Sequence, residues 1–229
     1  MDTVYVNMTS GINEGGIQKA AGIIKAGGLV AFPTETVYGL GANGFDPDAV
    51  AKIFKAKGRP QDNPLILHIS DMESLHELAS EVPDDALRLA HMFWPGPLTM
   101  VLKKRPIVPD VVTAGLKTVA IRMPANDIAL RLIEASGVPI AAPSANVSGR
   151  PSTTSGEHVM SDLSGVIDMV IDGGPARIGV ESTVVDMSGP MPSLLRPGGL
   201  GLEDIKLVLP SIEMGMDNPD GPARSPGLR

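Results

Sequence analysis

The stretch from Asp46 to Ser70 reads "DPDAVAKIFKAKGRPQDNPLILHIS". Its first half has acidic residues in the opening turn, lysines toward the end and a glycine stop at Gly58, which is how a helix is punctuated. After a short polar loop, Leu65 to Ser70 alternates its side chains between two faces, as a strand does. A helix, a loop and a strand in succession predict a domain in which helices pack on a sheet.

The same mixture continues on both sides of this stretch. Helix-period segments alternate with short apolar runs rich in β-branched residues, and no internal repeat or heptad is present. Further helices are expected over 14–26, 84–94, 127–136 and 202–209. Further strands are expected over 29–32, 36–41, 98–104, 118–124, 139–146, 168–174, 182–187 and 193–198. These segments predict an α/β or α+β fold around one twisted sheet.

Composition limits what this chain can be. It has 229 residues, 43% of them hydrophobic, so it can bury the core of one ordinary domain. The net charge of −7 argues against a surface coated with basic residues for nucleic acid. The absence of cysteine excludes disulfides and thiolate chemistry. The N-terminus lacks a secretion signal and no apolar run is long enough for a membrane span, so a cytoplasmic protein without membrane association is expected.

A cluster of cations lies at the end of the predicted helix. Lys55, Lys57 and Arg59 lie within five residues of one another, beside a glycine and two prolines. The two lysines can be explained by the negative end of the helix dipole, at about 0.3–1 kcal/mol each. Arg59 lies past the helix end and gains little from the dipole, so a phosphate or carboxylate ligand is expected there. Asn63 is restrained by the following proline and could offer its amide to the same ligand.

A second polar segment, "APSANVSGRPS", follows the predicted strand at 139–146. Ser144 and Asn146 are two residues apart and lie on one side if the chain is extended. An ordinary Ser/Asn/Gly turn explains this stretch taken alone. Arg150 and Ser152, however, extend the run of hydrogen-bond donors beyond what one turn requires.

The remaining polar candidates are weak when taken singly. His68 lies in a predicted strand, and a half-buried core histidine is the favoured interpretation. No second histidine stands at ligand spacing, so a zinc site is not expected. Arg122 ends a strand and could clamp a carboxylate beside a pocket. Ser182 and Arg196 are ordinary strand-edge residues on their own.

Together, however, seven motifs resemble one family in order. They are "FPTETVYGLG", "KAKGRPQDNPLILHI", "WPGPLT", "VAIRMP", "APSANVSGRPSTT", "ESTVVD" and "LLRPG". They are similar to the YrdC-like domain of threonylcarbamoyl-AMP synthases over about residues 10 to 210. The family pattern K-x-R…S-x-N falls on Lys57, Arg59, Ser144 and Asn146.

The resemblance implies a fold and a reaction. The fold is a YrdC-like twisted mixed sheet flanked by helices around a large, concave, positively charged cavity. The reaction is that of a nucleotidyltransferase: L-threonine, bicarbonate and ATP give threonylcarbamoyl-AMP and pyrophosphate. The downstream partner is a tRNA threonylcarbamoyl-transferase complex that makes N6-threonylcarbamoyladenosine, and weak tRNA binding is possible. Mg²⁺ would be held mainly by the ATP phosphates, which fits the lack of a carboxylate cluster.

The resemblance also implies roles for particular residues. Those implied to hold threonine are Thr36, His68, Arg122 and Ser182. Those implied to contact ATP are Arg59, Asn63, Thr118, Ser144, Ser152 and Arg196. Lys57 and Asn146 would lie close to the reacting groups, so the implied catalytic set is Lys57, Arg59, Ser144 and Asn146.

Two other functions remain open from the residues. An RNA-binding module could use the same basic cavity, although the acidic balance and the lack of stacking aromatics weigh against it. A related carbamoyl-transfer domain could keep the nucleotide site and act on another acceptor amine.

The end of the chain differs in composition from the rest. We expect residues 1–209 to form the YrdC-like catalytic domain and residues 210–229, rich in Pro, Gly and Asp, to form a linker-like tail. The tail resembles the linker that leads to a second domain in longer relatives. Either the chain is cut off in this linker or the protein works without that second domain.

Overall fold

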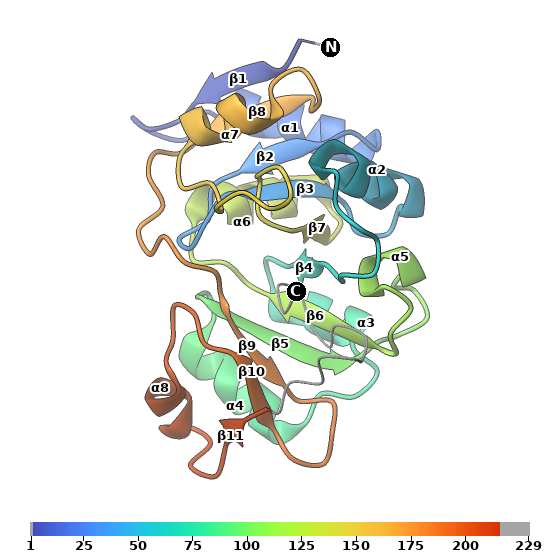
Figure 1. Ribbon diagram of the computed structural model, residues 1–229, viewed down its shortest axis with the longest axis vertical. Coiled ribbons are helices and arrows are strands. Elements are labelled where there is room, and N and C mark those ends of the chain that lie inside the picture. Colours follow the sequence, from blue (N-terminus) through green and yellow to red (C-terminus); the bar gives the residue numbers. More distant parts are fainter. Residues whose placement is uncertain (1, 216–229) are drawn as a thin grey trace.

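The structure is a computed structural model, and it describes residues 2–215. Its described strands form one mixed sheet of eleven strands in the order β1-β8-β2-β3-β7-β4-β6-β5-β9-β10-β11. Figure 1 shows β1 and β8 at one end of the molecule and β10 and β11 at the other. The strand bounds are β1 (Val4–Asn7), β2 (Val30–Phe32), β3 (Gly39–Asn43), β4 (Ile66–His68), β5 (Leu98–Lys103), β6 (Thr118–Arg122), β7 (Ile140–Ala142), β8 (Met169–Asp172), β9 (Thr183–Asp186), β10 (Ser193–Arg196) and β11 (Glu213–Met214).

Helices pack on both faces of this sheet. Their bounds are α1 (Glu14–Lys25), α2 (Pro47–Lys57), α3 (Met72–Leu78), α4 (Asp84–Phe93), α5 (Asp110–Thr113), α6 (Asp127–Ser136), α7 (Gly156–Leu163) and α8 (Leu202–Lys206). Buried side chains of α1 and α6 pack against β2, β7 and β8 in one cluster. Buried side chains from α2, α3, α4, α5, α7 and α8 form the larger cluster on the opposite face. Each large aliphatic side chain that is fully buried contributes about 1.5–3 kcal/mol.

The face that carries α1 and α6 is covered unevenly, and this positions the site. Ile66 of β4 and Ala120 of β6 point to that face in a small apolar cluster, to which no helix of residues 2–215 contributes. The parallel register of β4 and β6 places His68 beside Arg122 on the same face. A floor of strand residues with two polar side chains therefore lies beside the helix-covered half of the sheet.

The stretch from Asp46 to Ser70 folds as its sequence predicts. The Asp46 side chain caps α2 by accepting hydrogen bonds from the backbone N–H groups of Asp48 and Ala49, and Pro47 stands in the first turn. Gly58 ends the helix in the left-handed conformation with φ +61°. The chain therefore turns sharply between Lys57 and Arg59.

The expected twisted mixed sheet with flanking helices is confirmed. The structure adds β1, α3, α5, α7 and the short β11. The expected strand at 36–41 begins only at Gly39, because Thr34 to Tyr38 form a bend held by internal hydrogen bonds. None of the helices described here is long and apolar enough to cross a bilayer.

The predicted tail lies only partly within the described residues. Glu213–Met214 pairs in parallel with β10, so the sheet extends a few residues past position 209. Residues 216–229 lie outside the described residues, and the linker-like character of 210–229 stays a prediction.

Candidate active site

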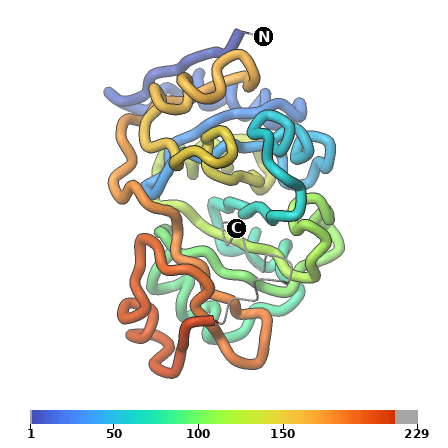
Figure 2. The backbone as a smooth tube through the Cα atoms, viewed as in Figure 1, coloured from blue at the N-terminus to red at the C-terminus, as the bar shows by residue number. Residues whose placement is uncertain are grey.

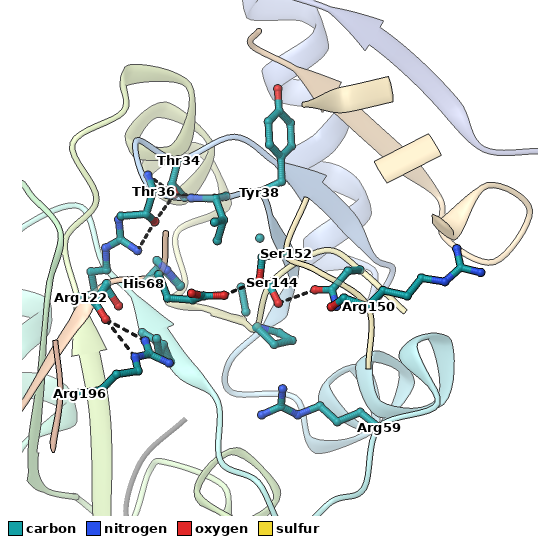
Figure 3. A pocket seen from close by; sticks show the side chains of 18 residues that line it. Thr34, Thr36, Tyr38, Arg59, His68, Arg122, Ser144, Arg150, Ser152 and Arg196 are labelled. Atoms are coloured by element: carbon teal, nitrogen blue, oxygen red, sulfur yellow. Dashed lines mark hydrogen bonds between the residues drawn. The ribbon is translucent and has the colours of Figure 1, made fainter. Parts of the chain in front are cut away.

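A cavity of about 310 Å³ lies over the strand floor described above. Its walls come from the bend before β3, the segment after β7, the start of β9, the end of β10 and the loop after α2 (Figure 3). This volume is at the lower end of the range for small-molecule sites, roughly 300–1,000 Å³. The large size that the resemblance implies therefore stays a prediction.

Arg122, at the end of β6, is buried at one side of the cavity. Its Nη1 donates to Thr36 Oγ1 at 2.9 Å, and its Nε donates to the Gly96 carbonyl at 3.2 Å. Nη2 lies 2.8 Å from Glu35 Oε1, so the two side chains form a buried ion pair. Burial lowers the pKa of Arg122, and the charge and hydrogen bonding of Glu35 oppose that shift. The guanidinium is thus fixed in place with part of its hydrogen-bonding capacity left for a ligand.

His68 lies beside Arg122 and lines the same cavity. Its ring meets Phe32 edge to face at 5.9 Å between ring centroids. Burial, and then the nearby charge of Arg122, lower the pKa of His68 to about 3. Its Nδ1 is buried and has no hydrogen-bond partner among the described atoms. A neutral imidazole with a free ring nitrogen is therefore available for a polar ligand.

Ser182 and Arg196 complete this side of the cavity. Ser182 Oγ and Thr99 Oγ1 are 2.8 Å apart and share a hydrogen bond. Arg196 donates to the Ser182 carbonyl from Nε at 3.2 Å and from Nη2 at 2.8 Å. Burial lowers the pKa of Arg196, Glu181 opposes the shift and Arg122 adds to it. Two arginines therefore approach the same cavity, Arg122 from β6 and Arg196 from β10, with β5 and β9 between these strands in the sheet.

One carboxylate lines the cavity in the described part of the chain, that of Glu181. The Ser152 hydroxyl donates to its Oε1 at 2.5 Å. Burial alone would raise the pKa of Glu181, but the bonds from Ser152 and from the residue's own backbone N–H, with the charge of Arg196, leave that pKa below its usual value. Glu181 is therefore ionised at neutral pH.

Arg59 reaches the cavity from the opposite side, as Figure 3 shows. Its Nη2 donates weakly to the carbonyls of Asn63 and Pro64, at 3.4 and 3.3 Å, and its buried Nε has no hydrogen-bond partner among the described atoms. Burial lowers the pKa of Arg59, and Asp62 opposes the shift. No carboxylate within residues 2–215 forms an ion pair with Arg59 within 4 Å.

Lys57 does not line the cavity, although it is buried beside the segment that does. Its Nζ donates to the carbonyls of Ser144 and Asn146, each at 2.5 Å, and lies 3.4 Å from Asn146 Oδ1. Burial, and then the charge of Arg59, lower the pKa of Lys57 to about 7, and Asp162 opposes the shift. These three acceptors match the three N–H bonds of an ammonium group. Lys57 therefore holds the segment after β7 in shape.

Ser144 and Asn146 face the cavity in that segment. The Ser144 hydroxyl donates to Asn146 Oδ1 at 2.5 Å. Asn146 Nδ2 donates to the carbonyls of Val147 and Arg150, at 2.9 and 2.8 Å. The side chains expected from the S-x-N pattern thus lie together, as that pattern predicts.

Two of the other predicted site residues lie off the cavity lining. Asn63 is buried and supplies the carbonyl that accepts from Arg59. Thr118 opens β6, where it pairs with Lys103. Sequence reasoning left Glu181 and Tyr38 unassigned, although both line the cavity. The signal for Glu181 was its place directly before Ser182 in the quoted "ESTVVD".

The residues 2–215 contain no group of three His, Cys, Asp or Glu side chains that could hold a metal ion.

Comparisons with known proteins point to one family. The family model Sua5_yciO_yrdC, described as "Telomere recombination", matches residues 22–198. The threonylcarbamoyl-AMP synthase of Pyrococcus abyssi is 59% identical over 212 residues, which are 93% of this chain and 62% of that protein. The threonylcarbamoyl-AMP synthase of Bacillus subtilis is 50% identical over 233 residues, or 98% of this chain and 66% of that protein. The chain thus spans less than two thirds of the length of both relatives.

A solved structure agrees with this match. The crystal structure of P. abyssi Sua5 complexed with L-threonine superposes with a TM-score of 0.96 at 56% identity. The match covers 99% of this chain and 68% of that one.

Proposed function

Because the chain belongs to the Sua5/YciO/YrdC family, we propose that it makes threonylcarbamoyl-AMP and pyrophosphate from L-threonine, bicarbonate and ATP. The observation that carries this proposal is the gathering of Arg59, Arg122 and Arg196 around one cavity in a chain of net charge −7. Such a cavity suits two anionic reactants that must meet.

L-Threonine would bind at the Arg122 side. The guanidinium of Arg122 would hold the carboxylate, with Thr36 and Ser182 as further hydrogen-bonding groups. The neutral His68 can accept a hydrogen bond through its free ring nitrogen, which suits the hydroxyl or the amino group of the ligand. The P. abyssi Sua5 structure, which is complexed with L-threonine, supports this assignment.

ATP would bind between Arg59 and Arg196, over the segment after β7. Ser144, Asn146 and Ser152 line that part of the cavity. Thr118 lies on the same face of β6 as Arg122, four residues and therefore about 13 Å along the strand. An extended nucleotide could follow this strand to Thr118, whereas Asn63 would act by steadying Arg59 through its carbonyl.

The proposed reaction depends on positioning the carbamate and the α-phosphate and on positive charge around them. The threonine amine and bicarbonate give a carbamate and water; a carbamate oxygen then attacks the α-phosphorus and pyrophosphate leaves. Two anions about 4 Å apart repel by ~1 kcal/mol in water and ~4 kcal/mol at an effective dielectric of 20. Arg59 and Arg196 would offset this repulsion and stabilise the charge that grows on the leaving group.

Mg²⁺, bound to the phosphates, would supply further neutralisation of their charge. In this proposal Lys57 and Asn146 shape the segment after β7, and no nucleophilic side chain is required.

A synthase assay tests the proposal. The protein is incubated with MgATP, L-threonine and labelled bicarbonate, and threonylcarbamoyl-AMP and pyrophosphate are measured. We expect both products, and neither when threonine or bicarbonate is left out. ATP turnover that is indifferent to threonine and bicarbonate would refute the proposal.

Arg59→Ala provides the matched test of the site. Loss of a charged group that stabilises a transition state costs about 10²–10³-fold in rate, so we expect a loss of that order. Arg131→Ala is the control, because Arg131 is an exposed arginine paired with Glu14 on the surface. An Arg59→Ala protein as active as the control would show that the assigned site is wrong.

We further propose that the product passes to a transferase complex that modifies tRNA, in the cytoplasm. The RNA-binding alternative predicts tight, salt-sensitive tRNA binding without nucleotide turnover, and the same preparations can be tested for that.

A further inference from the structure

Asp172, at the end of β8, is a buried carboxylate that the proposed reaction does not use. It accepts hydrogen bonds from Tyr5 at 2.5 Å, from Tyr38 at 2.8 Å and from the Gly174 backbone N–H at 2.9 Å. Gly156, the first residue of α7, lies directly against the Asp172 side chain. Burial alone would raise the pKa of Asp172, but these donors together hold that pKa below its usual value. The carboxylate therefore lies where β1, the bend before β3 and the start of α7 meet the end of β8.

Tyr38 connects this point to the nucleotide segment, which we define as residues 144–152. The Tyr38 carbonyl accepts from the Ala145 N–H at 2.8 Å, and the Tyr38 N–H donates to the Thr153 carbonyl at 2.9 Å. One residue thus holds both ends of the segment that carries Asn146 and Ser152. Figure 2 shows this yellow segment beside the blue turn before β3 and the cyan end of α2.

The Tyr38 hydroxyl fixes the orientation of its residue. It donates toward Asp172 Oδ1 and the Gly174 carbonyl, at 2.8 and 2.6 Å, and accepts from the Gly173 N–H at 3.1 Å. The ring is fully buried, so the side chain has no alternative partner in water.

Asp172 reaches the same segment by a second route, through α7. Gly156 opens α7 so close to Asp172 that an added Cβ would lie 2.6 Å from the Asp172 Cβ and Cγ atoms. On the next turns of α7, Asp162 accepts from the Arg150 Nη1 at 2.7 Å and from the Val147 N–H at 3.1 Å. The position of α7 against Asp172 thus sets the outer side of the nucleotide segment.

We propose that Asp172 and Tyr38 are positioning residues that hold the nucleotide segment in its ligand-binding shape. This inference rests on the proposed function for its link to ATP, but the positioning itself is a property of the fold. Tyr38 acts through its peptide group and Asp172 acts through Tyr38 and α7.

Tyr38→Phe tests the inference, because it removes only the hydroxyl. Tyr5→Phe is the matched control, because it removes a hydroxyl bond to the other oxygen of the same carboxylate, and no hydrogen bond among residues 2–215 joins Tyr5 to residues 144–152. Amide hydrogen exchange is measured over residues 144–152 in both variants and in the unmodified protein. We expect exchange there to be at least fivefold faster in Tyr38→Phe and unchanged within twofold in Tyr5→Phe.

Binding provides the second measurement, with MgATP and L-threonine titrated separately. We expect the Kd of ATP to rise at least fivefold in Tyr38→Phe, with the Kd of threonine within twofold. Asp172→Ala should show the same split, since it removes both acceptor oxygens, and it serves if Tyr38→Phe does not fold. Equal exchange in Tyr38→Phe and the unmodified protein, or equal loss in Tyr5→Phe, would overturn the inference. If the unmodified protein binds no ATP, the proposed function fails. The exchange data then still test whether Tyr38 positions residues 144–152.

Discussion

Arg122 has two tasks that a single substitution would disturb together. It balances the buried carboxylate of Glu35 and it faces the cavity. Removing one partner of a buried ion pair destabilises a protein by about 3–5 kcal/mol, because the other charge is left uncompensated. Arg122→Ala should therefore lower the free energy of unfolding and also raise the Kd of threonine.

The two effects can be separated. In Arg122→Ala with Glu35→Gln, we expect much of the stability to return while threonine affinity stays low. Denaturant unfolding and threonine titration on the unmodified protein and the two variants measure this. If threonine affinity returned with stability, Arg122 would have no direct role in binding.

Glu181 presents the opposite case, a negative charge in a cavity proposed for anions. An exposed charge pair at about 4 Å is worth ~1 kcal/mol in water. Glu181→Gln removes that charge and frees the Ser152 hydroxyl, so we expect the Kd of ATP to fall several-fold. Titration with ATP lacking a divalent cation is the measurement. A weaker complex would show that Glu181 meets a cation in the bound state.

His68 should make stability depend on pH. Its pKa is lowered from 6.5 to about 3 in the folded protein, so below pH 6.5 the unfolded chain binds the extra proton. Stability from this group is complete above pH 6.5 and is lost as the pH falls toward 3, by about 1.4 kcal/mol per pH unit. The free energy of unfolding between pH 6.5 and 4.5 should fall less steeply in His68→Gln. Parallel slopes in the two proteins would contradict a neutral buried histidine.

For single residues, the sequence predicts which side chains gather at a site better than it predicts where each of them points. It singled out Lys57 and Arg59 as cations at the end of a helix, expected a ligand at Arg59, and explained Lys57 either by the helix dipole or by a ligand. The answer depends on the left-handed Gly58 between them and on the carbonyls of Ser144 and Asn146, about 90 residues away. A contact so distant along the chain leaves no local pattern.

At the scale of the elements, substitution of glycine by alanine should have opposite effects on stability at two positions. An added Cβ on Gly198 would lie 2.2 Å from the Glu181 carbonyl oxygen and 2.6 Å from the Ser182 carbonyl carbon, both backbone atoms. Gly198→Ala should therefore force the turn after β10 away from β9 and destabilise by about 1–3 kcal/mol. Gly22 in α1 is exposed with open space around it, so Gly22→Ala should stabilise by up to about 1 kcal/mol.

Thermal unfolding of both variants checks the pair. Because the Gly198 turn lies against Ser182, its substitution should also weaken threonine binding, whereas Gly22→Ala should leave binding as it was. A Gly198→Ala protein that is as stable as the unmodified one would show that this close approach can relax without consequence.

The elements that the sequence predicted are the long or strongly apolar ones. The helices α1, α2, α4 and α6 have ten or more residues with a regular apolar face. The elements that were missed are short and obtain their stability from tertiary contacts. The strand β1 has half-buried residues at the sheet edge, and α7 begins with a glycine that only the close contact with Asp172 explains.

For the whole molecule, the contrast between its net charge and its cavity has a measurable effect. Salt at 0.15 M screens charges over about 8 Å. ATP carries several negative charges and L-threonine has no net charge at neutral pH. The Kd of ATP should therefore rise steeply with salt while the Kd of threonine changes little. Equal salt dependence for the two ligands would argue against separate charged and zwitterionic subsites.

The end of α2 performs two functions on either side of one glycine. Lys57 holds the segment at residues 144–152 in shape, and Arg59 places a positive charge in the cavity. An insertion or deletion between Lys57 and Arg59 would move both side chains at once. The shape of the segment and the charge in the cavity therefore cannot be changed independently. A redesign for a different ligand should therefore keep the sequence from Lys57 to Arg59 and vary side chains elsewhere in the cavity.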